Sequence, residues 1–272
     1  MVDDILTVQK CSKDAVKMNE TVNSFIEGKK LTLSKNKCHR IHVKRNKSKN
    51  EPKCAELRVH DDKMGESTQE KYLGDLINNS GTNRKTIEDR RNKGYGIVSE
   101  IIAILEEIPL GRFKHEIGLK LRQAMFLNGI LFNTEAWHSV TEEEIKMLET
   151  VDEHLLRALV KGQSKTPLEF LYLEAGAIPI RFLFSRRRLM YHQVILQRED
   201  NELTKRVYSA QKADPVKGDF VKLLEKDFEM ISEEQDDEKI TTVNSMTYKK
   251  DIKSKIRAAA FKMLKARQQE QS

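Results

Sequence analysis

The sequence has little cysteine and no long apolar run, and each shortage excludes a class of protein. Its 272 residues include only Cys11, Cys38 and Cys54, with no C-x-x-C pair. This odd, scattered set fits reduced thiols inside a cell better than a disulfide framework. No apolar stretch approaches the roughly 20 residues that span a bilayer, and the acidic start is unlike a signal peptide. We therefore expect a nuclear or cytoplasmic protein that is neither secreted nor bound to a membrane.

Familiar enzyme motifs and internal repeats are missing too. The sequence contains no G-x-x-x-x-G-K-[ST], G-x-S-x-G or H-E-x-x-H, which disfavours a P-loop nucleotidase, an α/β-hydrolase and a zincin. No period of about 20–50 residues recurs, so a solenoid is not expected. The excess of 49 Lys and Arg over 42 Asp and Glu gives a net charge of +7. This modest excess permits a polyanionic partner without specifying one.

The first eight residues carry a possible metal site. Asp3 and Asp4 follow Met1-Val2 and precede Ile5, so two carboxylates lie between residues that favour extended backbone. A tight β-turn between strands would present both carboxylates at its tip. Mg²⁺ takes a few carboxylate oxygens together with phosphate oxygens and water. A solvated turn without a metal ion is the simpler alternative.

The next part of the chain predicts one helix and several short strands. Apolar residues recur at helical spacing over residues 12–27. Alternation of apolar and polar residues predicts two strands, at 31–33 and 41–43, joined through Ser34 to Lys37. Residues 57–60 and 72–77 read as two further strands. The opening therefore predicts the order strand, helix, strand, strand.

A basic loop interrupts these strands. Residues 44–56 are mostly polar, contain Pro52 and lack periodicity, so they predict an exposed loop that includes Lys44 and Arg45. From Lys35 to Lys53 there are eight Lys and Arg against one acid. Contact with phosphate and a solvated or nuclear-localisation-like run are equally compatible with this composition.

Beyond residue 80 the sequence predicts helices throughout. Two capping boxes, Thr141 to Glu144 and Thr166 to Glu169, mark helix starts. The acidic stretch Asp236 to Glu238 reads as a linker. Periodicity, capping residues, Gly and Pro place helices at about residues 98–108, 115–132, 142–161, 167–175, 179–199, 200–211, 219–232 and 245–267.

Three other patterns have competing interpretations. Cys38, His39, His42, Cys54 and His60 could suggest zinc, since their spacings are near those of zinc ligands, but ordinary strand and loop positions explain them more simply. Trp137 is expected to anchor the helical core rather than to stack on a base. Residues 186–188 are three consecutive arginines, so at least one must face solvent or pair with nucleic acid.

Three motifs occur in one order along the chain. They are Met1-Val2-Asp3-Asp4, then Leu31-Thr32-Leu33-Ser34-x-x-Lys37, then Lys71-Tyr72-Leu73-Gly74. This order resembles the end of the palm and the following segment of a reverse transcriptase from a non-LTR retrotransposon. The helical remainder, with Arg90-Arg91-x-Lys93-Gly94, is similar to the helical extension found in such elements.

The resemblance implies a role for each matched residue. Asp3 would be the main ligand of Mg²⁺ or Mn²⁺ and Asp4 a supporting one, provided that the palm is complete. Lys37 would lie near the leaving pyrophosphate, and Tyr72 and Gly74 would hold the primer backbone. The partners implied are an RNA template and a DNA primer, while the oligomeric state stays open. The other residues expected at nucleic acid are Lys71, Lys44, Arg45, Arg90 and Arg91.

The expected fold class is α+β, a partial polymerase palm sheet followed by a mostly α-helical region. The resemblance divides it into a partial palm at 1–79, a thumb-like helical region at 80–162 and a helical C-terminal extension at 163–272. Such a palm also needs an upstream acidic strand and fingers, so we expect no polymerase activity from this chain alone. The alternatives are a non-catalytic nucleic-acid-binding or helical interaction module, or the product of a decayed gene.

Overall fold

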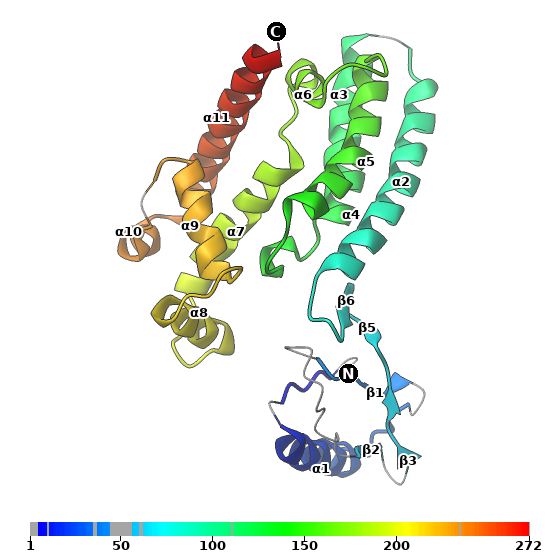
Figure 1. Ribbon diagram of the computed structural model, residues 1–272, viewed down its shortest axis with the longest axis vertical. Helices are drawn as coiled ribbons and strands as arrows, with labels where there is room; N and C mark the ends of the chain where they lie inside the picture. Colours follow the sequence, from blue (N-terminus) through cyan, green and yellow to red (C-terminus); the bar gives the residue numbers. More distant parts are fainter. Residues whose placement is uncertain are drawn as a thin grey trace. The chain divides into compact units, whose positions relative to one another are not determined.

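The protein is seen here in a computed structural model that is mostly helical, with short strand pairs near the N-terminus (Figure 1). Two compact units divide it, residues 1–85 and 86–272. None of the described helices has the length and apolar character needed to cross a membrane. The structure describes residues 5–9, 11–34, 37–43, 56–59, 62–109, 111–233 and 235–271, with the backbone alone at Arg112 and Gln271.

Helix α1, Ser12–Gly28, confirms the helix predicted at 12–27. Ile26 is its buried residue, so the helix keeps most of its surface in contact with solvent. Two of its side chains hold it to strand β2, Arg58–Val59. The amide groups of Asn19 and Asn23 both donate to the carbonyl oxygen of Arg58, at 2.8 and 3.0 Å. These bonds satisfy a backbone acceptor that the short strand alone leaves unpaired.

The described strands form three separate two-stranded pairs, so the predicted palm sheet is not seen among these residues. The strands predicted after Asp4, at 31–33 and at 41–43 are wrong, because residues 5–9, 31–34 and 41–43 have no regular structure. Isolated pairs have little face to bury, which explains why the strands stay short. The pairs are parallel β1, His39–Arg40, with β4, Gly65–Glu66; antiparallel β2, Arg58–Val59, with β3, Asp62–Lys63; and antiparallel β5, Gln69–Tyr72, with β6, Asp75–Asn78.

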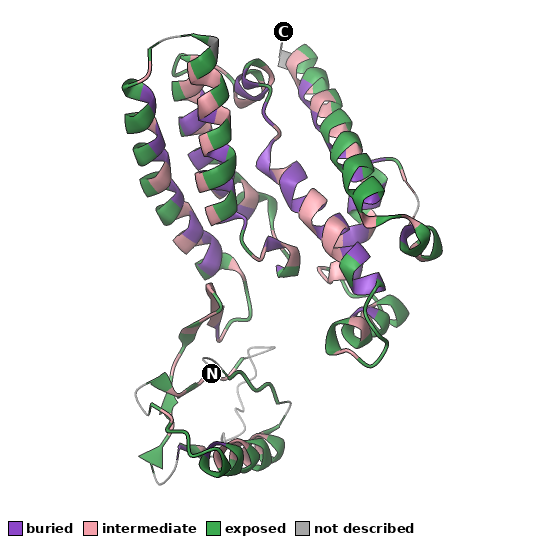
Figure 2. Ribbon diagram, turned by 180° about the vertical axis from the view of Figure 1, so that it is seen from behind, coloured by how far each residue is buried: buried purple, intermediate pink, exposed green. Residues whose placement is uncertain are grey.

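The second unit is built from helices around α7, Ile180–Leu196. Most residues of α7 are buried, as expected of a helix inside a bundle (Figure 2). Its first half packs with α5, Glu142–Val160, and its second half packs with α8, Leu203–Ala213, with α9, Phe220–Met230, and with α11, Ser245–Gln271. The other helices are α2, Arg84–Glu106; α3, Arg112–Leu121; η2, Arg122–Leu127; α4, Asn128–Ile130; η3, Thr134–Ala136; α5, Glu142–Val160; α6, Leu168–Ala175; α8, Leu203–Ala213; α9, Phe220–Met230; α10, Asp237–Thr242; and α11, Ser245–Gln271.

The local start and stop signals succeed in some places and fail in others. The capping box at Thr141 is confirmed, since its hydroxyl accepts from the Glu144 N–H and the Glu144 carboxylate accepts from the Thr141 N–H. The second box is wrong, because Pro167 is the N-cap of α6 and no side chain caps it. Gly176 ends α6 with a left-handed φ of 63°.

Three other helix predictions need correction. Helix α2 begins at Arg84 rather than near residue 98. The prediction started too late because Gly94 has a low helix propensity, although in the structure it lets the helix pack closely. A Cβ at Gly94 would lie 3.2 Å from side-chain atoms of both Phe126 and Val151. The helix predicted at 115–132 contains a π-helical segment, η2. The acidic stretch predicted as a linker contributes to α10, whose N-cap Asp236 accepts from the Lys239 N–H.

Candidate nucleic-acid interface

The segment Lys71 to Gly74 forms the tip of the β5–β6 hairpin, so the single strand predicted at 72–77 is wrong. Tyr72 pairs with Asp75, and the two residues between them have positive φ, 46° at Leu73 and 90° at Gly74. Positive φ at both central residues is the signature of a type I′ turn. Gly74 adopts this conformation without steric cost, whereas Leu73 does not. Leu73 is also 60% exposed at the tip, so burial does not compensate for this steric cost.

A close polar contact connects the Lys37 segment with this hairpin. His39 Nδ1 lies 2.9 Å from the Glu70 carboxylate, which brings β1 and β5 together. Lys37 precedes β1 by two residues and Lys71 follows Glu70, and both lysines are exposed. The structure therefore places two of the residues expected at nucleic acid on neighbouring segments. Asp3, Asp4, Lys44 and Arg45 lie outside the described residues.

Arg90 and Arg91 have different surroundings on α2. Arg90 is 8% exposed, donates to the carbonyl oxygen of Gly129 at 3.0 Å, and places its guanidinium 5.6 Å from the Phe132 ring centre. These contacts hold α2 against α4, which is a structural role. Arg91 is half-buried and donates to Asn92 at 3.3 Å. It lines a shallow pocket of about 310 Å³ that also contains Tyr95 and Lys146.

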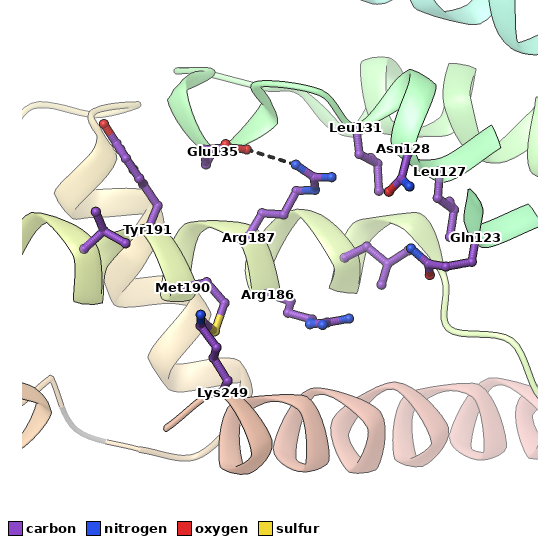
Figure 3. A pocket seen from close by; sticks show the side chains of 12 residues that line it. Gln123, Leu127, Asn128, Leu131, Glu135, Arg186, Arg187, Met190, Tyr191 and Lys249 are labelled. Carbon is purple, nitrogen blue, oxygen red and sulfur yellow. Dashed lines mark hydrogen bonds and ion pairs between the residues drawn. The ribbon is translucent and has the colours of Figure 1, made fainter. Parts of the chain in front are cut away.

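A larger groove lies along α7 in the second unit. We call it the α7 groove, and its volume is about 480 Å³. Figure 3 shows residues from η2 to η3, from α7 and from the start of α11 around it. Its lining combines leucine, methionine and valine with amide and basic side chains. The lining residues are Gln123, Leu127, Asn128, Leu131, Glu135, Leu183, Arg186, Arg187, Met190, Tyr191, Val194 and Lys249.

The α7 groove contains three cationic side chains and one carboxylate. Arg187 forms an ion pair with that carboxylate, Glu135, at 3.3 Å. Figure 3 shows the two guanidinium groups pointing in different directions from α7, with Arg187 directed at Glu135. Neither Arg186 nor Lys249 has a hydrogen-bond or ion-pair partner among the residues that the structure describes. Burial, together with the charge of Arg187, lowers the pKa of Arg186.

The other arginines of α7 already have protein partners. Arg188 makes a two-bond contact with Asp227, at 2.7 and 2.8 Å. Arg181 makes two bonds of 2.9 Å to Glu149 and reaches Glu142 at 3.1 Å. These pairs hold α7 against α9 and α5. Arg186 differs from both, since its guanidinium is available to a bound anion.

A buried ionic centre was not expected from the sequence. Arg122, in η2, donates to both carboxylate oxygens of Asp152 and to the carbonyl oxygen of Ile178. The Tyr172 hydroxyl donates to the same carboxylate at 2.9 Å, and burial and the Asp152 charge raise the pKa of Tyr172. All three charged or polar groups are enclosed, so the centre is structural. Only the three-dimensional packing brings together residues so distant in the chain.

A second buried polar cluster surrounds His192. Its Nε2 lies 2.9 Å from the Tyr208 hydroxyl and 3.3 Å from the Asp237 carboxylate, and its Nδ1 has no partner among the described residues. Burial lowers the pKa of His192 to about 4, although Asp237 acts in the opposite direction. Lys212 closes the cluster with a 2.6 Å contact to Asp237. The imidazole is therefore uncharged at neutral pH.

No metal site can be built from the described residues, where no three His, Cys, Asp or Glu side chains gather suitably. Cys54 and His60 lie outside the described part, so the zinc interpretation stays a prediction. Trp137 is confirmed as a core residue, 4% exposed and 5.7 Å from the Phe184 ring. The chain matches no protein-family model, and no curated protein or solved structure matches it significantly.

Proposed function

We propose that this chain belongs to an RNA-directed DNA polymerase of the non-LTR retrotransposon kind and contributes nucleic-acid binding to it. The β5–β6 hairpin carries this proposal. Its tip is the Lys71-Tyr72-Leu73-Gly74 motif, which presents an exposed apolar side chain beside a glycine that permits close approach. A leucine in a left-handed conformation at an exposed tip is poorly explained by stability alone.

The proposed chemistry is metal-dependent nucleotidyl transfer. Asp3 and Asp4 supply carboxylate oxygens, the donors that Mg²⁺ and Mn²⁺ prefer. When bound, the metal ions would stabilise charge at the attacking hydroxyl and at the leaving pyrophosphate. Lys37 adds a positive charge on the segment that the His39–Glu70 pair joins to the hairpin. Tyr72 and Gly74 hold the primer backbone.

Binding to a DNA primer annealed to an RNA template tests the role of the hairpin. We expect Leu73→Glu to weaken binding of the full chain about tenfold, because it places a carboxylate beside phosphate. Leu203→Glu is the matched control, since Leu203 is 74% exposed on α8 and the charge change is identical. Fluorescence anisotropy of a labelled primer measures both. Equal affinities for the two variants, or no binding by the unchanged chain, would contradict the proposal.

The second candidate is a nucleic-acid-binding module without catalysis. The α7 groove favours it, because this basic site lies in the helical unit and uses none of the proposed catalytic residues. Binding variants separate the two functions, because this chain alone is not expected to extend a primer. Affinity for a primer–template that falls in Leu73→Glu supports the polymerase, whereas affinity that depends on the α7 groove and not on Leu73 supports the module.

A further inference from the structure

The feature that leads beyond the hairpin is the Arg186 guanidinium. It is half-buried, and no carboxylate pairs with it among the described residues. Partial removal of a cation from water is unfavourable unless an anion compensates for it. Arg181, Arg187 and Arg188 on the same helix each have such an anion within the protein. A bound anion would compensate Arg186 in the same way.

We propose that the α7 groove binds the phosphodiester backbone of a single-stranded nucleic acid, with Arg186 and Lys249 contacting its phosphates. This inference rests on the proposed nucleic-acid binding and adds a site and a strand type. Three cations against one carboxylate leave the lining with a net positive charge. A guanidinium matches the geometry of two phosphate oxygens, and an ammonium acts as a more flexible point charge.

The apolar part of the groove favours a single strand over a duplex or a simple anion. Val194 is 41% exposed and Met190 is half-buried, so both offer apolar surface to a sugar or base, and Tyr191 adds a half-buried ring. Sites for single strands combine a positive groove with such surfaces, because unpaired bases expose their faces. A duplex hides these faces, and inorganic phosphate cannot use the apolar wall. The volume of about 480 Å³ is in the range of preformed ligand sites.

The basic helix α11 can extend the binding site for the nucleic-acid strand beyond the α7 groove. It carries eight Lys and Arg against two acids, and Lys249 near its start lines the groove (Figure 3). Its exposed residues Lys250, Lys253 and Arg257 follow at helical spacing and therefore lie on one side. A backbone that leaves Lys249 can thus meet further positive charges. This arrangement distinguishes an extended polyanion from a mononucleotide.

The test compares affinities for a labelled single-stranded RNA oligonucleotide. We expect Arg186→Gln in the full chain to weaken binding about tenfold, the effect of losing a charged hydrogen bond. The variant should also lower the slope of log affinity against log salt by about 0.7, the value for one single-strand phosphate. Lys249→Gln, at an exposed position, should weaken binding in the same direction. Arg206→Gln is the matched control, because Arg206 is exposed on α8 outside the groove.

Distinct results would overturn distinct parts of the inference. If Arg186→Gln and Lys249→Gln bind like Arg206→Gln while the unchanged chain binds RNA, the α7 groove is not the binding site and the proposed function stands. If the unchanged chain binds no nucleic acid, both fail. Competition by an equal-length duplex or by a mononucleotide as strong as that of the single strand would overturn the strand type. Thermal unfolding by circular dichroism confirms that each variant keeps the fold.

Discussion

Different kinds of contact stabilise the interior of each of the two units of the molecule. In the described part of residues 1–85, the buried apolar side chains are Ile26 and Val59, and side-chain amides and half-exposed ion pairs join the segments. In residues 86–272, three apolar clusters surround buried arginine–carboxylate pairs. Exposed pairs contribute little to stability, whereas breaking a buried pair is strongly destabilising. The same substitution should therefore have very different effects in the two units.

Asp152→Asn should give the largest effect. It leaves the buried Arg122 guanidinium without its charged partner, and we expect the free energy of unfolding of the helical unit to fall by about 3–5 kcal/mol. Urea unfolding followed by circular dichroism measures the change. Asp89→Asn is the control, since Asp89 pairs with Lys93 across one helical turn near the surface, and about 0.5 kcal/mol is expected. Similar losses for both variants would show that burial does not set the difference.

Acidification should give the next largest effect, again in the helical unit. The folded-state pKa of His192, about 4, is below its ordinary value of 6.5, so the unfolded chain binds more protons between these values. Stability is full above pH 6.5 and falls as the pH drops toward 4, by at most about 3 kcal/mol. Burial acts against ionisation of Asp237, but Lys212, His192 and Tyr208 outweigh it and lower its pKa. The Asp237 contribution is therefore lost below this window.

The variant His192→Phe should remove most of this pH dependence. Its ring can fill the same space near Phe228 without taking up a proton, so stability should change little between pH 6.5 and 4. Unfolding curves at three pH values compare the two proteins. An equally steep loss in the variant would assign the dependence to other groups. The groups that face His192 are Asp237, Tyr208, Lys205 and Lys212.

The two units also differ in how much of their structure the sequence could predict. Periodicity, the Thr141 cap and Gly176 predicted most helices of the second unit, because these signals are local. The Arg122–Asp152 pair had no such signal, since its partners are 30 residues apart and meet only through packing. In the first unit, alternating residues were assigned to strands that do not form. A pattern that short is compatible with a strand and with an irregular segment held by side chains.

The candidate sites show the same limit. The Lys71-to-Gly74 motif could be found in the sequence because its residues are contiguous, although its turn was placed inside a strand. The α7 groove could not be assembled in advance, because its lining comes from three separated segments. The three consecutive arginines at residues 186–188 showed that at least one of these side chains must face solvent or a ligand. Which arginine it was depended on carboxylates located on α5, α9 and η3.

The smallest effect is expected at the hairpin tip of the first unit, where stability and nucleic-acid binding can be separated. Leu73→Asn places the preferred Asn-Gly pair in the type I′ turn, so we expect the hairpin to gain roughly 1 kcal/mol because the left-handed strain of leucine is removed. Amide hydrogen exchange in β5 and β6 should slow, while that of α5 stays unchanged. If Leu73 is present for contact rather than for stability, the stabilised variant should also bind a primer–template less tightly. A more stable hairpin with unchanged affinity would instead make the leucine an accident of sequence and remove the main support for the primer contact.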